Sequence, residues 1–180
     1  MSNVRPPAVA NAFYPGHPAL LGSTVDQLLA AATVVAAPPP KALIVPHAGY
    51  IYSGSTAALA YATLKPLRQQ ISRVILLGPT HRVAVNGLAL PETSAFATPL
   101  GNIPLDLAAI ARLRDLPQIV FSDRVHAQEH SLEVHLPFLQ RVLDDFKLVP
   151  LAVGEATPQA VAEVLNVLWG GPETLIVISS

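Results

Sequence analysis

The 180-residue sequence contains no cysteine. This absence excludes disulfide bonds, thiolate nucleophiles and cysteine-based zinc sites. Charged residues are also scarce, at 13% of the chain, and they sum to a formal net charge of −1. The lysines and arginines are scattered, so the sequence lacks the basic surface that binds nucleic acid or an anionic membrane. We therefore expect no nucleic-acid partner.

Long apolar runs are missing as well. No stretch reaches the ~18 apolar residues that a membrane-spanning helix requires. The first residues, "MSNVRPPAVANAFYPG", lack the apolar region of a signal peptide. We therefore expect no membrane partner and a cytoplasmic location. What the sequence has in quantity is hydrophobic residues, at 51%, which favour a single globular domain over residues 1–180.

Short apolar runs alternate with helical segments along the chain. Strands are expected at 42–45, 73–78, 86–91, 118–122, 146–154 and 173–180, and helices at 18–35, 53–67, 105–116, 127–145 and 157–170. Residues 1–17 and 98–104 are expected to be irregular. This alternation is typical of a parallel sheet covered on both faces, so the sequence predicts a three-layer α/β/α fold with a mostly parallel central sheet. Because the last core strand ends at Ser180, we expect a chain truncated at its C-terminus.

Two of the expected strands are followed by similar corners. His47 comes two residues after "ALIV", and His81 comes three residues after "LLG". Ligands of open α/β sheets bind outside the carboxyl ends of the strands, so both imidazoles are expected at one crevice. Two neutral imidazoles suit zinc, iron, copper or nickel, and with a carboxylate they suit non-haem Fe(II). Alternatively, each histidine only hydrogen-bonds a nearby carbonyl group.

The segment "HAQEHSLEVH" is a second polar cluster. On a helix, four of its side chains would share one face: His126, Glu129, His130 and Glu133. His126 and His130 could then hold a metal between them. Alternatively, Glu129 and His130 are supporting or acid–base groups beneath the strand-end site, or the segment is a solvated polar face. Tyr50, close to His47 in the sequence, is a candidate proton donor or pocket wall, with packing as the alternative.

Five motifs together resemble one family. In order they are "RPPAVANAFYP", "PHAGYIYSG", "LLGPTHR", "TPLGNIPLD" and "EHSLEVHLPFLQ". They resemble the Memo-like family, also called AmmeMemoRadiSam system protein B. The resemblance implies an α/β/α fold related to class III extradiol dioxygenases, which use non-haem iron. It also implies that His47 and His81 are metal ligands and that Glu129 and His130 have pocket roles. Family members carry an Asp and a His after "ISS", and a third ligand further on, so we expect incomplete metal coordination here.

The expected function is that of a Memo-like metal-binding protein with a dioxygenase-type site. Fe(II) is the expected cofactor, with zinc or copper as alternatives, and the substrate would be a catecholic or enediol small molecule. His130 and Glu129 would support the reaction, and Tyr50 would line the pocket. The alternatives are a zinc-dependent hydrolase and a non-catalytic module that holds a peptide or partner. Apolar surface left exposed would favour a homo-oligomer.

These expectations have geometric consequences. If His47 and His81 share a metal, their nearest ring nitrogens should lie within roughly 5 Å, because each ligand sits ~2.0–2.1 Å from the ion. His130 should approach them, whereas His126, at the start of the expected helix, should be more exposed. The segment "TLIVISS" should form an interior parallel strand that opens on the same crevice.

Overall fold

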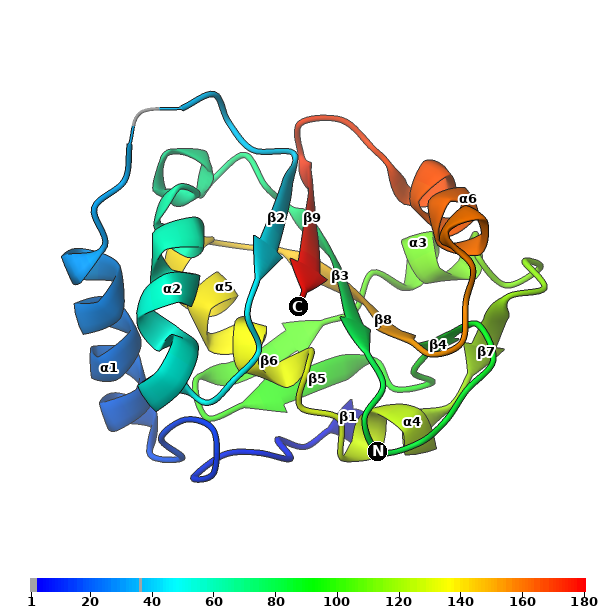
Figure 1. Cartoon of the computed structure of the whole chain (residues 1–180), viewed down its shortest axis with the longest axis horizontal. Helices are drawn as coiled ribbons and strands as arrows, with labels where there is room; N and C mark the ends of the chain where they lie inside the picture. The colour runs from blue at the N-terminus through cyan, green and yellow to red at the C-terminus, as the bar shows by residue number, and fades with distance from the viewer. Residues whose placement is uncertain (1–2, 36) are drawn as a thin grey trace.

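The computed structural model describes residues 3–35 and 37–180 (Figure 1). Its main sheet has six strands in the order β2-β9-β3-β8-β4-β7. Their bounds are β2 (Ala42–Val45), β9 (Thr174–Ser179), β3 (Arg73–Pro79), β8 (Lys147–Val153), β4 (Leu88–Leu90) and β7 (Ile119–Phe121). Neighbouring strands are parallel except β4 and β8, which are antiparallel. The mostly parallel sheet is thus confirmed, and each expected strand lies within two residues of its predicted bounds.

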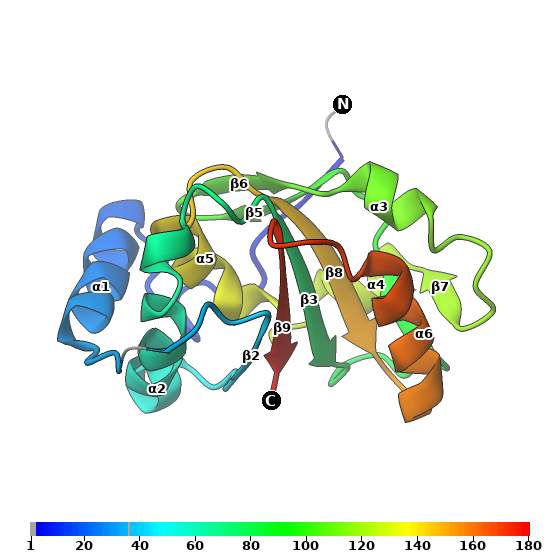
Figure 2. The same cartoon turned by 90° about the horizontal axis from the view of Figure 1, so that it is seen from above.

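Helices cover both faces of this sheet. One layer contains α1 (Pro18–Ala31), α2 (Tyr50–Ala62) and α5 (Leu136–Val142), and the other contains α3 (Leu107–Ala111) and α6 (Pro158–Leu168) (Figure 2). The three-layer α/β/α fold is therefore confirmed. Among residues 3–35 and 37–180, no helix combines the length and the apolar character that a membrane crossing needs.

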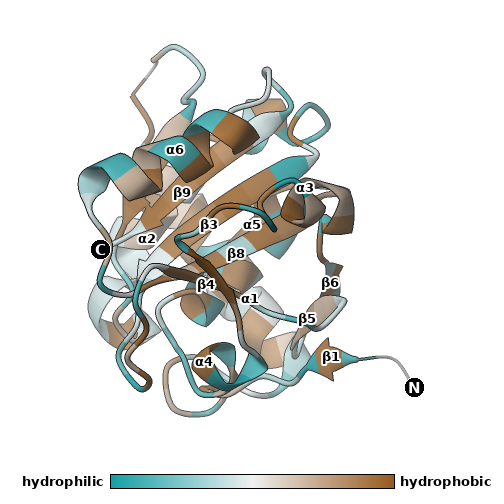
Figure 3. Ribbon diagram, turned by 90° about the vertical axis from the view of Figure 1, so that its right-hand side faces the viewer, coloured by the Kyte–Doolittle hydropathy of each residue, from teal (hydrophilic) through white to brown (hydrophobic). Residues whose placement is uncertain are grey.

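The interior strands β9, β3 and β8 carry nearly continuous apolar runs, which appear brown in Figure 3. In β3, for example, Val74, Ile75 and Leu76 are completely buried. Such runs fit strands that are covered on both faces, because every side chain then points into a core. The expectation that "TLIVISS" is an interior parallel strand is confirmed, since β9 lies between β2 and β3.

A second, three-stranded sheet was not expected. It consists of β1 (Val4–Arg5), β5 (Ala95–Thr98) and β6 (Gly101–Pro104), in the order β1-β5-β6. Of the segment 1–17, residues 1 and 2 lie outside the described part of the chain. The prediction of a loop at 98–104 was wrong, because β5 and β6 pair there as a hairpin. Glycine, asparagine and proline, which occur in this hairpin, are uncommon in strands. The sequence therefore does not indicate these strands, and only their pairing in the structure shows them.

The single helix expected at 127–145 was also wrong. The chain forms α4 (Asp123–Ala127), then a short 3-10 helix, η2 (Glu133–His135), and then α5. The Glu129 side chain accepts a hydrogen bond from the Ser131 backbone N–H at 3.0 Å, a local bond that competes with helix formation. Pro137 then lies in the first turn of α5, where proline is tolerated.

The other helices are present but shifted or shortened. The helix expected at 53–67 begins earlier, at Tyr50, with Gly49 at its N-cap. The helices expected at 18–35, 105–116 and 157–170 occupy Pro18–Ala31, Leu107–Ala111 and Pro158–Leu168. The early start of α2 matters for function, because it leaves only a short corner between β2 and the helix, and His47 lies in that corner.

Candidate metal centre

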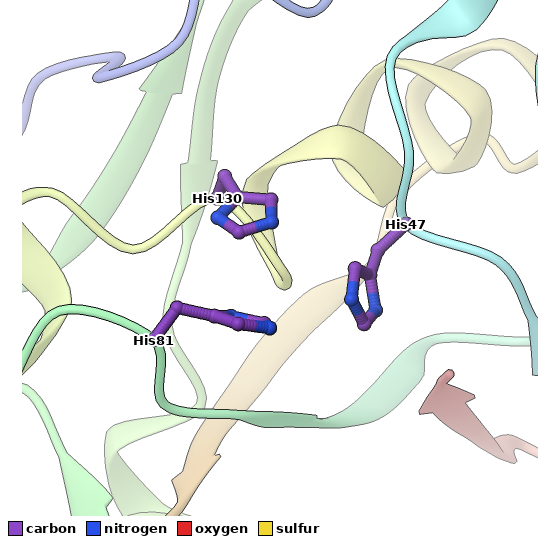
Figure 4. A group of neighbouring side chains, drawn as sticks. All are labelled: His47, His81 and His130. Carbon is purple, nitrogen blue, oxygen red and sulfur yellow. The ribbon is translucent and has the colours of Figure 1, made fainter. Parts of the chain in front are cut away.

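Three histidine rings meet at the carboxyl edge of the main sheet. His47 follows β2, His81 follows β3, and His130 comes from the segment between α4 and η2. Figure 4 shows the three rings facing a common space. Their centroids are 5.2 Å apart for His47 and His81, 5.5 Å for His47 and His130, and 4.5 Å for His81 and His130. The predicted convergence of His47 and His81 is confirmed, as is the approach of His130.

The spacing of these rings suits a shared metal ion. Each histidine offers one nitrogen, and the three nitrogens all lie within 4.8 Å of one another. Ligands ~2.0–2.1 Å from one ion are at most ~4.2 Å apart, so small ring rotations are enough to reach ligating positions. The three histidines could therefore hold a metal ion, although only two ligands were expected within this chain.

The Glu129 carboxylate lies beneath two of the rings. It accepts hydrogen bonds from the backbone N–H and the ring Nδ1 of His81, at 2.6 and 2.9 Å, and its Oε1 is 3.3 Å from Nδ1 of His130. Only 1% of Glu129 is exposed. Burial alone would raise its pKa, but hydrogen bonds from Ser131 and His81 outweigh burial and lower the pKa to about 2. Glu129 is therefore ionised. It holds the His81 ring through Nδ1, so Nε2 is the nitrogen that this bond leaves unused.

The same environment keeps two of the rings neutral. Burial lowers the pKa of His47, and the neighbouring rings of His81 and His130 lower it further. Burial also lowers the pKa of His130, although the charge of Glu129 opposes this effect. A neutral imidazole has the lone pair that a metal ligand needs, so both rings can bind a metal at neutral pH.

His126 does not belong to this cluster. It is 1% exposed, its Nε2 lies 3.0 Å from the Ala89 carbonyl oxygen, and its ring packs against Phe96. Burial lowers its pKa to about 4. The expectation that His126 is exposed was wrong, and the structure does not support the alternative in which His126 and His130 hold a metal between them. Because α4 ends at Ala127, the spacing of four residues no longer places the two rings on one helix face.

Tyr50 points into the core rather than toward the histidines. Its hydroxyl group donates to the Val134 carbonyl oxygen at 2.8 Å, and its ring packs against Tyr14 and Phe138. The residue is 8% exposed. The structure therefore supports the alternative in which Tyr50 packs in the core. It does not place this side chain on the wall of the histidine site.

The prediction that Glu133 shares a helix face with His130 missed its actual role. Glu133 is completely buried and forms an ion pair with Arg5 at 2.7 Å. Its carboxylate also accepts hydrogen bonds from the Tyr14 hydroxyl group and from two backbone N–H groups of the N-terminal segment. Arg5 in turn donates to the carbonyl oxygens of His126 and Glu129. This buried network holds the loop that carries Glu129 and His130 in place. Arg5 and Tyr14 belong to the motif "RPPAVANAFYP", but the motif alone does not predict their contacts with Glu133.

Comparison with known proteins agrees with this architecture. Residues 5–180 match the family described as Memo-like protein. The chain is 38% identical over 151 residues to a MEMO1 family protein of Aquifex aeolicus, covering 83% of this chain and 55% of the relative. It is 35% identical over 188 residues to a MEMO1 family protein of Archaeoglobus fulgidus, covering 98% and 66%.

A vertebrate relative gives a similar result. Protein MEMO1 of Xenopus laevis is 33% identical over 179 residues, which cover 95% of this chain and 59% of the relative. The chain thus spans between 55% and 66% of the length of these three relatives. Since the family match covers nearly all of residues 1–180, the chain belongs to the Memo-like family.

Proposed function

We propose that His47, His81 and His130 hold an Fe(II) ion in a site of the non-haem dioxygenase type. The observation that carries this proposal is the group of three imidazole nitrogens within 4.8 Å of one another. The predicted acid–base role of His130 is the alternative to ligation by this ring.

The donor set fits such an ion. Imidazole suits Fe, Zn, Cu and Ni, whereas the softer thiolate ligands are excluded because the chain has no cysteine. Three protein ligands would leave open positions on an iron ion, as the three ligands of the two-histidine, one-carboxylate iron oxygenases do. The sequence motifs resemble the Memo-like family, and the relation to class III extradiol dioxygenases that this resemblance implies favours Fe(II) within this group of metals.

Bound Fe(II) would supply the redox chemistry by which a catecholic or enediol substrate reacts with O2. The protein's own residues would position the reactants. Glu129, ionised and buried, holds His81 through hydrogen bonds and places a negative charge beside His130. This charge would offset part of the positive charge of the ion and raise the basicity of the rings.

Two open hollows, one beside His81 and one beside His47, offer space for a small molecule. One, of about 510 Å³, is lined by His81 and by both polar and apolar residues, among them Arg82 and Val85. The other, of about 530 Å³, is lined by His47 and by apolar side chains that include Val161 and Ile178. The two hollows adjoin each other, because Pro79, Val153 and Gly154 line both of them.

A zinc-dependent hydrolase is the second candidate. A set of three imidazoles is also a ligand set of catalytic zinc, which keeps its fourth position for a water molecule. The same residues would hold the zinc, and zinc would supply the Lewis acidity that lowers the pKa of that water toward neutrality. This candidate rests on the absence of a carboxylate among the three groups that face the common space.

One experiment separates the candidates. The chain is purified without oxygen and loaded in parallel with Fe(II) and with Zn(II), and oxygen uptake with catechols and hydrolysis of nitrophenyl esters are measured. We expect oxygen uptake with catechol in the Fe(II) form only, and its loss in His81→Ala. Ester hydrolysis by the Zn(II) form alone would favour the hydrolase. If neither reaction is observed and peptide binding is unchanged in His47→Ala, a non-catalytic binding module would be favoured.

A further inference from the structure

We propose that Ser179 is a positioning residue of the metal centre, because its hydroxyl group fixes the tautomer of His47. The inference rests on the proposed metal site and adds a residue to it. Ser179 is the last residue of β9, the strand that lies beside β2 and β3. Its Oγ atom lies 2.7 Å from Nδ1 of the His47 ring.

The direction of this hydrogen bond follows from a second contact. The Ser179 hydroxyl group also lies 2.7 Å from the carbonyl oxygen of Ser131. A carbonyl oxygen can only accept, so the single hydroxyl proton of Ser179 is used in that bond. The Oγ atom can then only accept from His47, which means that Nδ1 of His47 carries the ring proton. Nε2 is left with the lone pair that a metal ligand needs.

The acceptor is itself held in place. The Ser131 hydroxyl group donates to the Pro79 carbonyl oxygen at 2.8 Å, and the Ser131 backbone N–H donates to Glu129 at 3.0 Å. Ser131 is completely buried and Ser179 is 5% exposed. If the Ser179 hydroxyl group turned toward His47, the buried Ser131 carbonyl oxygen would lose its hydrogen-bond donor. Such a loss is unfavourable.

Ser131 thus connects the supports of all three rings. Its N–H binds the Glu129 carboxylate, which lies beneath His81 and His130, and its carbonyl oxygen binds Ser179, which supports His47. Each ring is approached at its Nδ1 atom. The arrangement favours metal binding through the opposite nitrogen, Nε2, on every ring.

Gly78 makes room for this connection. A Cβ atom at position 78 would lie 2.8 Å from Leu132 Cδ2, 2.9 Å from Ser131 Oγ and 3.1 Å from Ser179 Cβ. Contacts this short require the neighbouring groups to move apart. Gly78→Ala should therefore disturb the pair of serines without removing a hydrogen-bonding group, and it provides a second way to test the inference.

The first test observes the tautomer without any metal. Nitrogen-15 NMR of the His47 ring is recorded on the metal-free chain at pH 8, where the ring is neutral. We expect a proton on Nδ1 in the wild type and in Ser179→Thr, and a mixture of tautomers in Ser179→Ala. Ser180→Ala, which changes the exposed neighbouring serine, should leave the spectrum unchanged. A wild-type ring protonated on Nε2 would overturn the inference without any variant.

The second test measures metal affinity by competition with a chelator, using Zn(II) as the probe. We expect ~10–100-fold weaker binding in Ser179→Ala and Gly78→Ala, as for other groups that orient a ligating histidine. Ser179→Thr and Ser180→Ala should bind like the wild type. Equal affinity in Ser179→Ala would contradict the inference. If the wild type binds no metal but the tautomer changes as expected, the proposed function fails while the role of Ser179 in orienting His47 stands.

Discussion

The Glu129 carboxylate accepts hydrogen bonds from both the backbone N–H and the ring Nδ1 of His81, at 2.6 and 2.9 Å. One buried anion therefore determines where this ring lies and which of its nitrogens faces the other two histidines. The two residues are 48 positions apart in the sequence, so the site depends on how the loop after α4 packs against the end of β3.

Glu129→Gln is predicted to weaken metal binding by ~10–100-fold, because a neutral amide accepts less strongly from His81 and removes a negative charge next to the ion. Chelator competition measures the change. Glu155→Gln is the matched control, since Glu155 is an exposed carboxylate of the hollow beside His81. Similar affinities for Glu129→Gln and the wild type would show that the carboxylate does not orient a ligand.

His130→Ala and His126→Ala are predicted to have opposite effects. Loss of His130 should abolish metal binding, whereas loss of His126 should leave it intact. His126→Ala should instead lower the free energy of unfolding by ~2–4 kcal/mol, because it opens a cavity and leaves the Ala89 carbonyl oxygen without its donor. Metal content and urea denaturation test the two halves separately. Full metal content in His130→Ala would instead support the acid–base role of this residue.

Arg5→Ala is predicted to destabilise the fold by ~3–5 kcal/mol, because it leaves the buried Glu133 carboxylate without its cation. Urea denaturation measures the change. The control is Arg68→Ala, which removes an exposed ion pair with Asp144 and should cost less than ~1 kcal/mol. Equal losses for the two variants would mean that the buried pair does not anchor the loop of Glu129 and His130.

The stability of the fold should depend on pH through two buried histidines that lie outside the three-histidine cluster. Burial lowers the pKa of His126 to about 4 and that of His135 to about 3. In the unfolded chain both rings take up a proton near their ordinary pKa of ~6.5. The stability is therefore complete above pH ~6.5 and decreases as the pH falls toward the folded pKa values, by up to ~1.4 kcal/mol per pH unit for each ring.

The pH dependence can be assigned to a residue by substitution. In His135→Leu, the decrease of the free energy of unfolding between pH ~6.5 and pH ~4 should become shallower, by up to ~1.4 kcal/mol per pH unit. Denaturation series at several pH values measure this slope, and His17→Leu, at an exposed position, serves as the control. An unchanged slope in His135→Leu would show that this ring is not neutral in the folded state.

The sequence predicted the parts of the site that depend on local pattern. The apolar runs of β2 and β3 locate the strands, and the rule that ligands meet at the carboxyl ends of parallel strands brings His47 and His81 together. The surroundings of His130 could not be predicted in this way. "EHSLEVH" has helical spacing, but Glu129 forms hydrogen bonds with Ser131 and with the distant His81, and these bonds replace the helix.

The burial of polar side chains was the other feature that the sequence did not predict. Glu133 and His126 look like a solvated helix face in the sequence, but Arg5, Tyr14 and Ala89 provide partners for them in the core. These partners come from other segments of the chain, and no local pattern reveals them.

The central claim is that His47, His81 and His130 form one metal site, and metal stoichiometry tests it most directly. The chain is purified without oxygen, incubated with Fe(II), freed of excess metal and subjected to elemental analysis, together with His47→Ala and His17→Ala. We predict about one iron per chain in the wild type and in His17→Ala, which changes an exposed histidine outside the cluster, and none in His47→Ala. Equal iron content in all three proteins, or no iron in the wild type, would contradict the account.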